Sequence, residues 1–215
     1  MDELRIGVLG ADGSSRYTAA PDSLATLVFG HGSGADMRHS SMHSIADAFA
    51  SEGLSTLRFN FPFKEAGRSR VDSKEVSTAT IAAALEFAKQ RWEGPHYLGG
   101  HSFGGRMAMH AVVDRDLEVD GMIFGSFPLH PAGKPSVTRA EHLDEAEVSM
   151  LFLSGTRDAL AQSELLAEAT DRVGARLKWL DTGDHGYKTL KRSREDDIFS
   201  EMASYALEFV LETSA

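Results

Sequence analysis

The sequence of 215 residues contains no cysteine, and this absence excludes several kinds of chemistry at once. Without thiols there is no disulfide, no thiolate nucleophile and no cysteine-based metal site. No apolar run approaches the length that spans a bilayer. The N-terminal residues Met1 to Arg5 are acidic and polar, whereas a signal peptide would be basic and then apolar. We therefore expect a cytoplasmic protein that has no membrane partner.

Positive charge is also scarce, because 22 Lys and Arg stand against 32 Asp and Glu, for a formal net charge of −10. Neither nucleic acid nor an anionic membrane attracts such a chain, so we expect no nucleic-acid partner. A content of 42% hydrophobic and 25% charged residues argues against disorder and predicts an ordinary globular protein. The length predicts one domain over residues 1–215 with little room for a lid. The oligomeric state has no signature in the sequence.

Short apolar segments alternate with amphipathic helical patterns along the chain. The polar stretch 10–15 is interpreted as a turn, and the Pro-rich segment 126–135 as an irregular connector that forms a partial rim over the site. Alternating strands and helices predict an α/β fold, in which a mostly parallel twisted sheet has helices on both faces. In such sheets ligands bind beyond the carboxyl ends of the strands. Strands are expected at residues 4–9, 24–29, 55–61, 121–125, 148–153 and 177–180, with another immediately before Ser102.

A serine stands at a sharp bend between a predicted buried strand and a predicted helix. Residues 100–104 have the form G-x-S-x-G, in which the flanking glycines let strand and helix approach closely while the backbone of Ser102 is strained. Such a bend exposes the serine hydroxyl above the sheet. The pentapeptide therefore makes Ser102 the candidate nucleophile.

A serine hydroxyl needs a histidine base and a carboxylate that orients the base. Asp158 follows the strand at 148–153, and His185 follows the strand at 177–180, so the chain order is serine, acid, histidine. Asp184 is a rival acid, but neighbouring side chains on a loop usually diverge, which favours Asp158. Asp181 is a weaker rival.

An acyl-transfer site also needs donors for the oxyanion. One is the backbone N–H of Phe103, the residue after the nucleophile. The glycine-rich loop after the strand at 24–29 offers the second donor, with Ser33 as first choice and Gly34 as second. The alternative is that this loop is a plain turn.

Further polar side chains come from loops or strand ends near the predicted mouth of the site. His101 is interpreted as an orienting or packing residue beside the nucleophile. His39 and His43 lie one helical turn apart, but no third ligand accompanies them, so we expect no metal and no cofactor. The candidate pocket residues are His31, His101, Arg58, His130 and Lys134, and the cations among them, with Arg68, suggest an anionic group on the substrate.

Over nearly its whole length the chain resembles the α/β-hydrolase superfamily, and more closely its small, lidless dienelactone-hydrolase-like branch. The residues that carry the resemblance are the loop 31–36, the segment 58–62, the G-x-S-x-G elbow, the segments 127–131 and 133–135, and the loops with Asp158 and His185. Within the branch, the chain resembles the bacterial relatives of a group whose eukaryotic members are regarded as subunits of complexes. Dienelactone hydrolases proper use a cysteine nucleophile where this chain has Ser102, so their substrate does not carry over. The resemblance implies the fold and the roles of Ser102, Asp158 and His185.

Two hypotheses follow from the sequence. The first is a serine hydrolase that cleaves a small ester or related acyl substrate through an acyl-enzyme. The second is a non-catalytic α/β-hydrolase scaffold that binds another protein. The complete Ser102, Asp158 and His185 set favours the first, because a scaffold has no physical need for these side chains.

Overall fold

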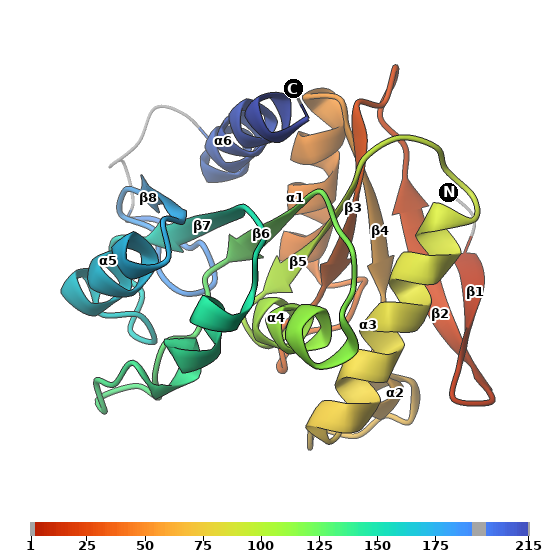
Figure 1. Cartoon of the computed structure of the whole chain (residues 1–215), viewed down its shortest axis with the longest axis horizontal. Coiled ribbons are helices and arrows are strands. Elements are labelled where there is room, and N and C mark those ends of the chain that lie inside the picture. Colours follow the sequence, from red (N-terminus) through yellow and green to blue (C-terminus); the bar gives the residue numbers. More distant parts are fainter. Residues whose placement is uncertain (1–2, 191–196, 215) are drawn as a thin grey trace.

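The computed structural model describes residues 3–190 and 197–214, so Met1 and Asp2 of the acidic N-terminal segment lie outside the described residues (Figure 1). Eight strands form one sheet in the order β1-β2-β4-β3-β5-β6-β7-β8. The strands from β4 to β8 along this order are parallel, whereas β1 and β2 form an antiparallel hairpin that joins β4 at the edge. The strands are β1 (Glu3–Val8), β2 (Ala11–Thr18), β3 (Ala25–Gly30), β4 (Leu54–Phe59), β5 (His96–His101), β6 (Gly121–Gly125), β7 (Met150–Gly155) and β8 (Arg176–Leu180).

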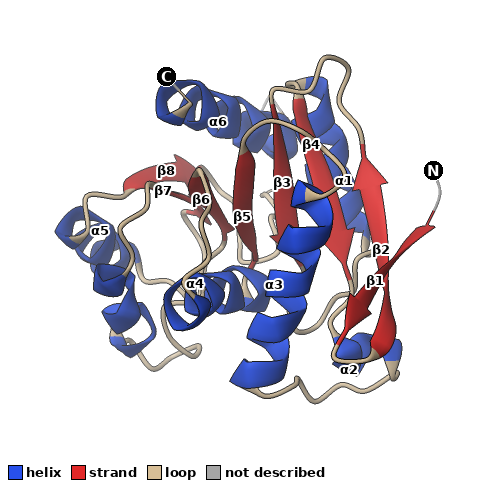
Figure 2. Cartoon of the chain, turned by 45° about the vertical axis from the view of Figure 1, so that its right-hand side comes forward, coloured by secondary structure: helices blue, strands red, loops and turns tan. Residues whose placement is uncertain are grey.

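Helices cover both faces of the sheet (Figures 1 and 2). Helices α1 (Ser40–Ser51) and α6 (Ile198–Thr213) pack on one face, and α3 (Lys74–Lys89), α4 (Phe103–Arg115) and α5 (Ser163–Arg172) pack on the other. The short α2 (Pro62–Glu65) follows β4, and a 3-10 helix, η1 (Thr138–Glu145), precedes β7. Among the described residues, no helix has the length and apolarity needed to cross a membrane. The predicted α/β architecture, a mostly parallel sheet with helices on both faces, is confirmed.

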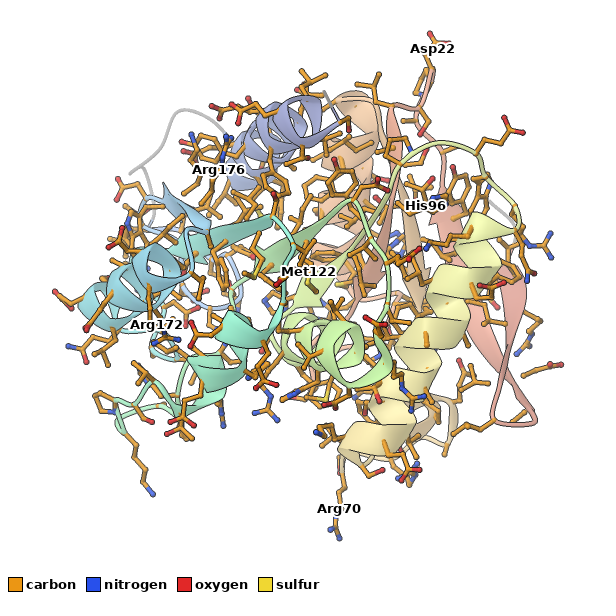
Figure 3. The ribbon with its side chains drawn as sticks, in the orientation of Figure 1. Asp22, Arg70, His96, Met122, Arg172 and Arg176 are labelled. Atoms are coloured by element: carbon orange, nitrogen blue, oxygen red, sulfur yellow. The ribbon has the colours of Figure 1, made fainter. Side chains whose placement is uncertain are left out.

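The apolar segments of the sequence form the central strands of the sheet, where helices cover both faces. Every residue of β3, β4, β6 and β7 is buried, as expected for parallel strands that are covered on both faces. Figure 3 shows Met122 of β6 among packed side chains, whereas Asp22 and Arg70 project from the rim. The apolar side of α1 consists of the residues expected from helical spacing: Met42, Ile45, Ala46 and Phe49.

The interpretation of residues 10–15 as a turn holds only for Gly10, because residues 11–15 lie in strand β2. Only Leu9 and Gly10 form the turn of the hairpin, with φ angles of +48° and +82°. The sequence Ala11–Thr18 has no apolar run, so its strand conformation depends on its neighbours. It pairs with β1 and β4, and the buried Ser15 hydroxyl donates to the carbonyl oxygen of Leu4 at 3.2 Å. Sheet pairing thus outweighs the local turn preference of this stretch.

The carboxyl ends of the parallel strands meet at one edge of the sheet, and the connection between β6 and β7 (126–149) rises from that edge. Phe127 and Leu129 are buried in the core, whereas the Pro-rich residues 131–135 are exposed. This segment, which includes η1, flanks the edge. Over the described ranges there is no separate lid domain.

Candidate active site

Ser102 alone forms the junction between β5, which ends at His101, and α4, which begins at Phe103. Its φ of +53° and ψ of −114° lie in a region that serine rarely adopts. The Ser102 N–H donates to the carbonyl oxygen of Gly125 at 2.8 Å, which ties the strained residue to the neighbouring strand. This is the strand-turn-helix geometry in which a serine hydroxyl is presented above a sheet.

The two glycines of the motif are required by backbone contacts. A Cβ on Gly100 would lie 2.5 Å from the carbonyl oxygen of Gly30 in β3, and a Cβ on Gly104 would overlap the same oxygen. No side-chain rotation relieves either contact, because the opposing atoms belong to the backbone. The two glycines of the G-x-S-x-G pattern are therefore needed for the close packing of α4 against β5 and β3.

We expect the Gly104→Ala substitution to lower the free energy of unfolding by about 3 kcal/mol or more, because α4 must move away from β3. Gly7→Ala in β1 is the matched control, since nothing lies within 4 Å of its new methyl group. Urea unfolding followed by circular dichroism measures both values. Equal stabilities of the two variants would contradict the steric role of Gly104.

The structure brings Ser102, His185 and Asp158 together from the loops after β5, β8 and β7. His185 Nε2 lies 2.9 Å from Ser102 Oγ, and His185 Nδ1 lies 2.9 and 2.8 Å from the two carboxylate oxygens of Asp158. The carboxylate accepts the Nδ1–H, so Nε2 is free to accept the serine proton. The Asp158 side chain is fully buried and also accepts from the N–H of Leu160 at 2.8 Å. The geometry suits proton transfer from Ser102 to His185.

The rival acid Asp184 has a different position. Its carboxylate Oδ1 accepts from the N–H groups of Gly186 at 2.8 Å and Lys188 at 2.9 Å, so it closes the loop that carries His185. Asp181 likewise accepts from the N–H of Thr182 at 2.9 Å. Of the three acids, Asp158 is the one whose carboxylate contacts the His185 ring.

His101 holds the backbone of that same loop. Its Nε2 donates to the carbonyl oxygen of His185 at 2.8 Å, which assigns the proton to Nε2. Burial lowers the pKa of His101 to about 4, so the ring is neutral at physiological pH. The ring also lies against Tyr187, with a centroid distance of 5.4 Å. The contacts of Nε2 and the ring agree with the prediction of an orienting residue, whereas Nδ1 faces Gly32 in the loop after β3.

His31 has a comparable place beneath the candidate oxyanion loop. Its Nε2 accepts from the N–H of Phe61 at 3.3 Å, and its Nδ1 donates to the carbonyl oxygen of Gly32 at 2.8 Å. Burial lowers its pKa to about 4, so His31 is a neutral link between the ends of β3 and β4. A Cβ on Gly32 would lie 3.6 Å from Ser102 Cβ, which places this loop against the nucleophile.

Among the described residues, the remaining predicted pocket residues make no hydrogen bond to the serine. Arg58 is fully buried and donates to the carbonyl oxygen of Met37 at 3.2 Å and to Thr18 Oγ1 at 3.1 Å, so the expectation that it lies at the mouth is wrong. These two hydrogen bonds hold the guanidinium inside the protein. Burial lowers the pKa of Arg58 to about 10. Lys134 is exposed on the Pro-rich connector.

His130 links two loops through hydrogen bonds of its ring. The N–H of Gln162 donates to its Nε2 at 2.9 Å, and its Nδ1 donates to the carbonyl oxygen of Pro131 at 2.9 Å. The backbone N–H of His130 donates to the carbonyl oxygen of Leu160 at 3.0 Å, just after Asp158. The buried His130 thus anchors the acid loop to the Pro-rich connector, a role that the sequence pattern did not indicate.

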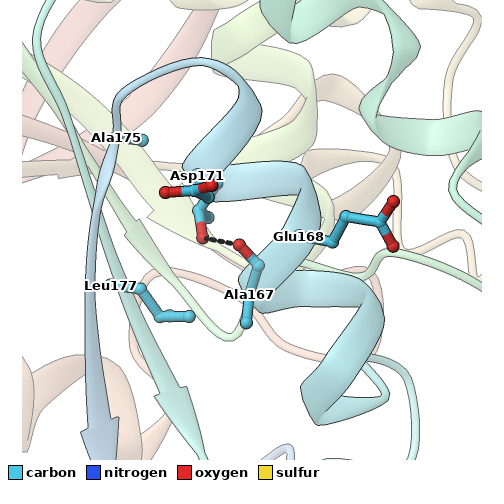
Figure 4. Close-up of a pocket in the computed structure, with 6 residues that line it drawn as sticks. Ala167, Glu168, Asp171, Ala175 and Leu177 are labelled. Carbon is cyan, nitrogen blue, oxygen red and sulfur yellow. Dashed lines mark hydrogen bonds between the residues drawn. The ribbon is translucent and has the colours of Figure 1, made fainter.

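A groove between α5 and the segment before β8 carries none of these residues (Figure 4). Its walls hold the carboxylates Glu168 and Asp171 but no serine or histidine. Within residues 3–190 and 197–214, no group of three histidine or acidic side chains is arranged to hold a metal ion. The strand-end site around Ser102, in contrast, holds a serine, a histidine and a carboxylate in hydrogen-bond contact.

Comparison with known proteins agrees with the fold. A family model described as alpha/beta hydrolase domain matches residues 23–211. Est1E from Butyrivibrio proteoclasticus, solved with ferulic acid, superposes with a TM-score of 0.77 at 16% identity, covering 98% of each chain. Dienelactone hydrolase from Anabaena variabilis gives a TM-score of 0.75 at 15% identity, covering 98% of this chain and 97% of its own.

A third solved structure is described as an α/β serine hydrolase without lid, from Xanthomonas campestris. It superposes with a TM-score of 0.73 at 16% identity, covering 98% of this chain and 93% of its own. At these identities the structural likeness establishes the fold, and the family model adds the sequence evidence over most of the chain. By its sequence and its fold, the chain belongs to the alpha/beta hydrolase family.

Proposed function

We propose that this protein is a serine hydrolase that cleaves small esters or related acyl substrates through an acyl-enzyme. The observation that carries the proposal is the continuous chain of contacts from Ser102 Oγ through His185 to the buried Asp158 carboxylate. Family membership supports the reaction class. The relative solved with ferulic acid supports a small substrate.

In the first half of the reaction His185 Nε2 takes the proton of Ser102 as the hydroxyl oxygen attacks the acyl carbon. Asp158 stabilises the imidazolium that forms. The bond to the leaving alcohol breaks as His185 returns the proton to it. In the second half, a water molecule loses its proton to His185, attacks the acyl-enzyme, and the acid departs as Ser102 regains its proton.

The negative charge on the carbonyl oxygen needs two donors in this scheme. We assign them to the N–H of Phe103 and to that of Ser33, with Gly34 as the alternative. In the described part of the chain, none of these N–H groups donates a hydrogen bond to another protein atom. Gly32 accepts from the N–H of Ala35 at 3.0 Å, which closes the loop that presents Ser33 and Gly34.

A fluorophosphonate probe tests the proposal, because it reacts with activated serines whatever their substrate. We expect native protein to be labelled and heat-denatured protein to stay unlabelled. Short p-nitrophenyl esters are expected to be hydrolysed faster than long-chain ones, since no separate lid domain within residues 3–190 and 197–214 is there to hold a long chain. Absence of labelling together with failure on a broad ester panel would favour the scaffold hypothesis instead.

A further inference from the structure

Arg106 lies in the first turn of α4, four residues after Ser102. Its Nε atom is buried without a hydrogen bond, and in the described residues no carboxylate pairs with its guanidinium. A buried donor left unpaired costs on the order of 1–3 kcal/mol. A cation near a helix N-terminus is also disfavoured by the helix dipole. The fold therefore tolerates an unfavourable charge beside the nucleophile.

A second arginine approaches the same place from η1. Helices α4 and η1 lie side by side (Figure 1), and they meet where the rings of His110 and His142 stack at 4.0 Å. Arg106 precedes His110 by one turn of α4, and Arg139 precedes His142 by one turn of η1. Each arginine thus lies one turn closer to the N-terminus of its helix than the stacked histidine of that helix. Their mutual repulsion adds to burial in lowering the pKa of Arg106.

Both arginines belong to the edge of the sheet that carries the serine. Helical side chains lean toward the helix N-terminus, so the Arg106 guanidinium covers the turn that begins at Ser102. Arg139 Nη1 donates to the carbonyl oxygen of Pro128 at 3.4 Å, at the start of the connector that leaves β6. Among the described residues, this is the one hydrogen bond that the Arg139 side chain makes. Its other guanidinium donors therefore have no protein acceptor.

The other cations suggested by the sequence do not supply this charge. Arg58 is buried under Met37 and Thr18, and Arg68 is paired with Asp72 at 2.7 Å. Of the two stacked histidines, His110 adds no charge at neutral pH, because burial and its cationic neighbours lower its pKa to about 4. The positive charge next to the nucleophile comes from the two arginines.

We propose that Arg106 and Arg139 form a binding site for an anionic group, a carboxylate or a phosphate, that the substrate carries next to the acyl group being cleaved. The inference rests on the proposed hydrolase function and names its substrate class. Guanidinium groups match the geometry of both anions and hydrogen bond to them in pairs. Binding would satisfy the buried Arg106 Nε and relieve the repulsion between the two cations.

The kinetic test compares two esters of equal chain length, the p-nitrophenyl monoester of adipic acid and p-nitrophenyl hexanoate. Native protein is expected to prefer the adipate ester in kcat/KM. Arg106→Gln and Arg139→Gln are each expected to lower the adipate-to-hexanoate ratio by about tenfold or more. Arg91→Gln is the control, because it removes the same charge from an exposed residue before β5, at the opposite edge of the sheet. It should leave the ratio unchanged.

A ratio that stays constant in both arginine variants, or falls equally in Arg91→Gln, would overturn the inference. Hydrolysis of the hexanoate ester reports the proposed function separately. A binding test does not depend on turnover: calorimetric titration of the Ser102→Ala protein with adipate and with inorganic phosphate. We expect binding that is lost in Arg106→Gln, and the tighter anion identifies the ligand class. Equal or absent binding with and without Arg106 would count against the site even if esters are cleaved.

Discussion

Replacing Ser102 by alanine is expected to abolish fluorophosphonate labelling and to lower kcat/KM for a short ester by a factor on the order of 10⁴ to 10⁶. The reason is geometric, since the Ser102 hydroxyl is the group within 2.9 Å of His185 Nε2. Without it no covalent acyl-enzyme forms, and residual activity comes from binding and the oxyanion donors. Gel fluorescence after labelling and initial rates of ester hydrolysis measure the effect.

Ser51→Ala is the matched control for this experiment, because Ser51 is exposed at the far end of α1. It should retain both labelling and rate. Circular dichroism should show that both variants are folded. If the Ser102→Ala protein were still labelled as strongly as the native one, another nucleophile would be at work and the assignment would be wrong.

The second large effect is expected for Asp158→Asn, which should lower kcat by about 10⁴-fold. An asparagine amide can donate to His185 Nδ1, so the imidazole would carry its proton on Nε2 and could no longer accept from Ser102. The buried carboxylate also stabilises the imidazolium, and a neutral amide does so poorly. Steady-state kinetics on a short ester measure the loss.

Asp184→Asn discriminates between the two candidate acids. Asp184 accepts from Gly186 and Lys188 within its own loop, so the change should cost stability of that loop and far less activity. Its effect on kcat is expected to be at least a hundredfold smaller than that of Asp158→Asn. A larger loss in Asp184→Asn than in Asp158→Asn would reverse the assignment made from the sequence.

Sequence reasoning predicted the elements that carry their own hydrophobic signal. The strand that precedes Asp158 is a continuous apolar run, and its burial on both faces follows from composition alone. The hairpin strand Ala11–Thr18 was missed because its residues are mostly polar, and its extended conformation depends on pairing with β1 and β4. A strand whose stability comes from partners distant in sequence leaves little local pattern to read.

Charge and hydrogen bonding of individual side chains were harder to predict. His31 and His130 were expected in the pocket, but each uses both ring nitrogens to link loops. Arg58 was expected at the mouth and is buried in the core. Arg106 and Arg139 were not singled out, although the place of Arg106 one turn after Ser102 was a signal. Such roles depend on which backbone groups lie nearby, and a linear sequence does not give those distances.

The sequence by itself determined the fold class, the bend at Ser102 and the order of serine, acid and histidine. It could do so because burial leaves apolar periodicity, and because a tight strand-to-helix contact permits only glycine at residues 100 and 104. Tertiary structure alone decided which carboxylate contacts His185. It also decided that His101 supports the histidine loop, and that Arg106, one turn after the nucleophile, has a buried Nε without a hydrogen bond. Those facts are distances of a few ångströms between residues far apart in the chain, and packing of the folded chain sets them.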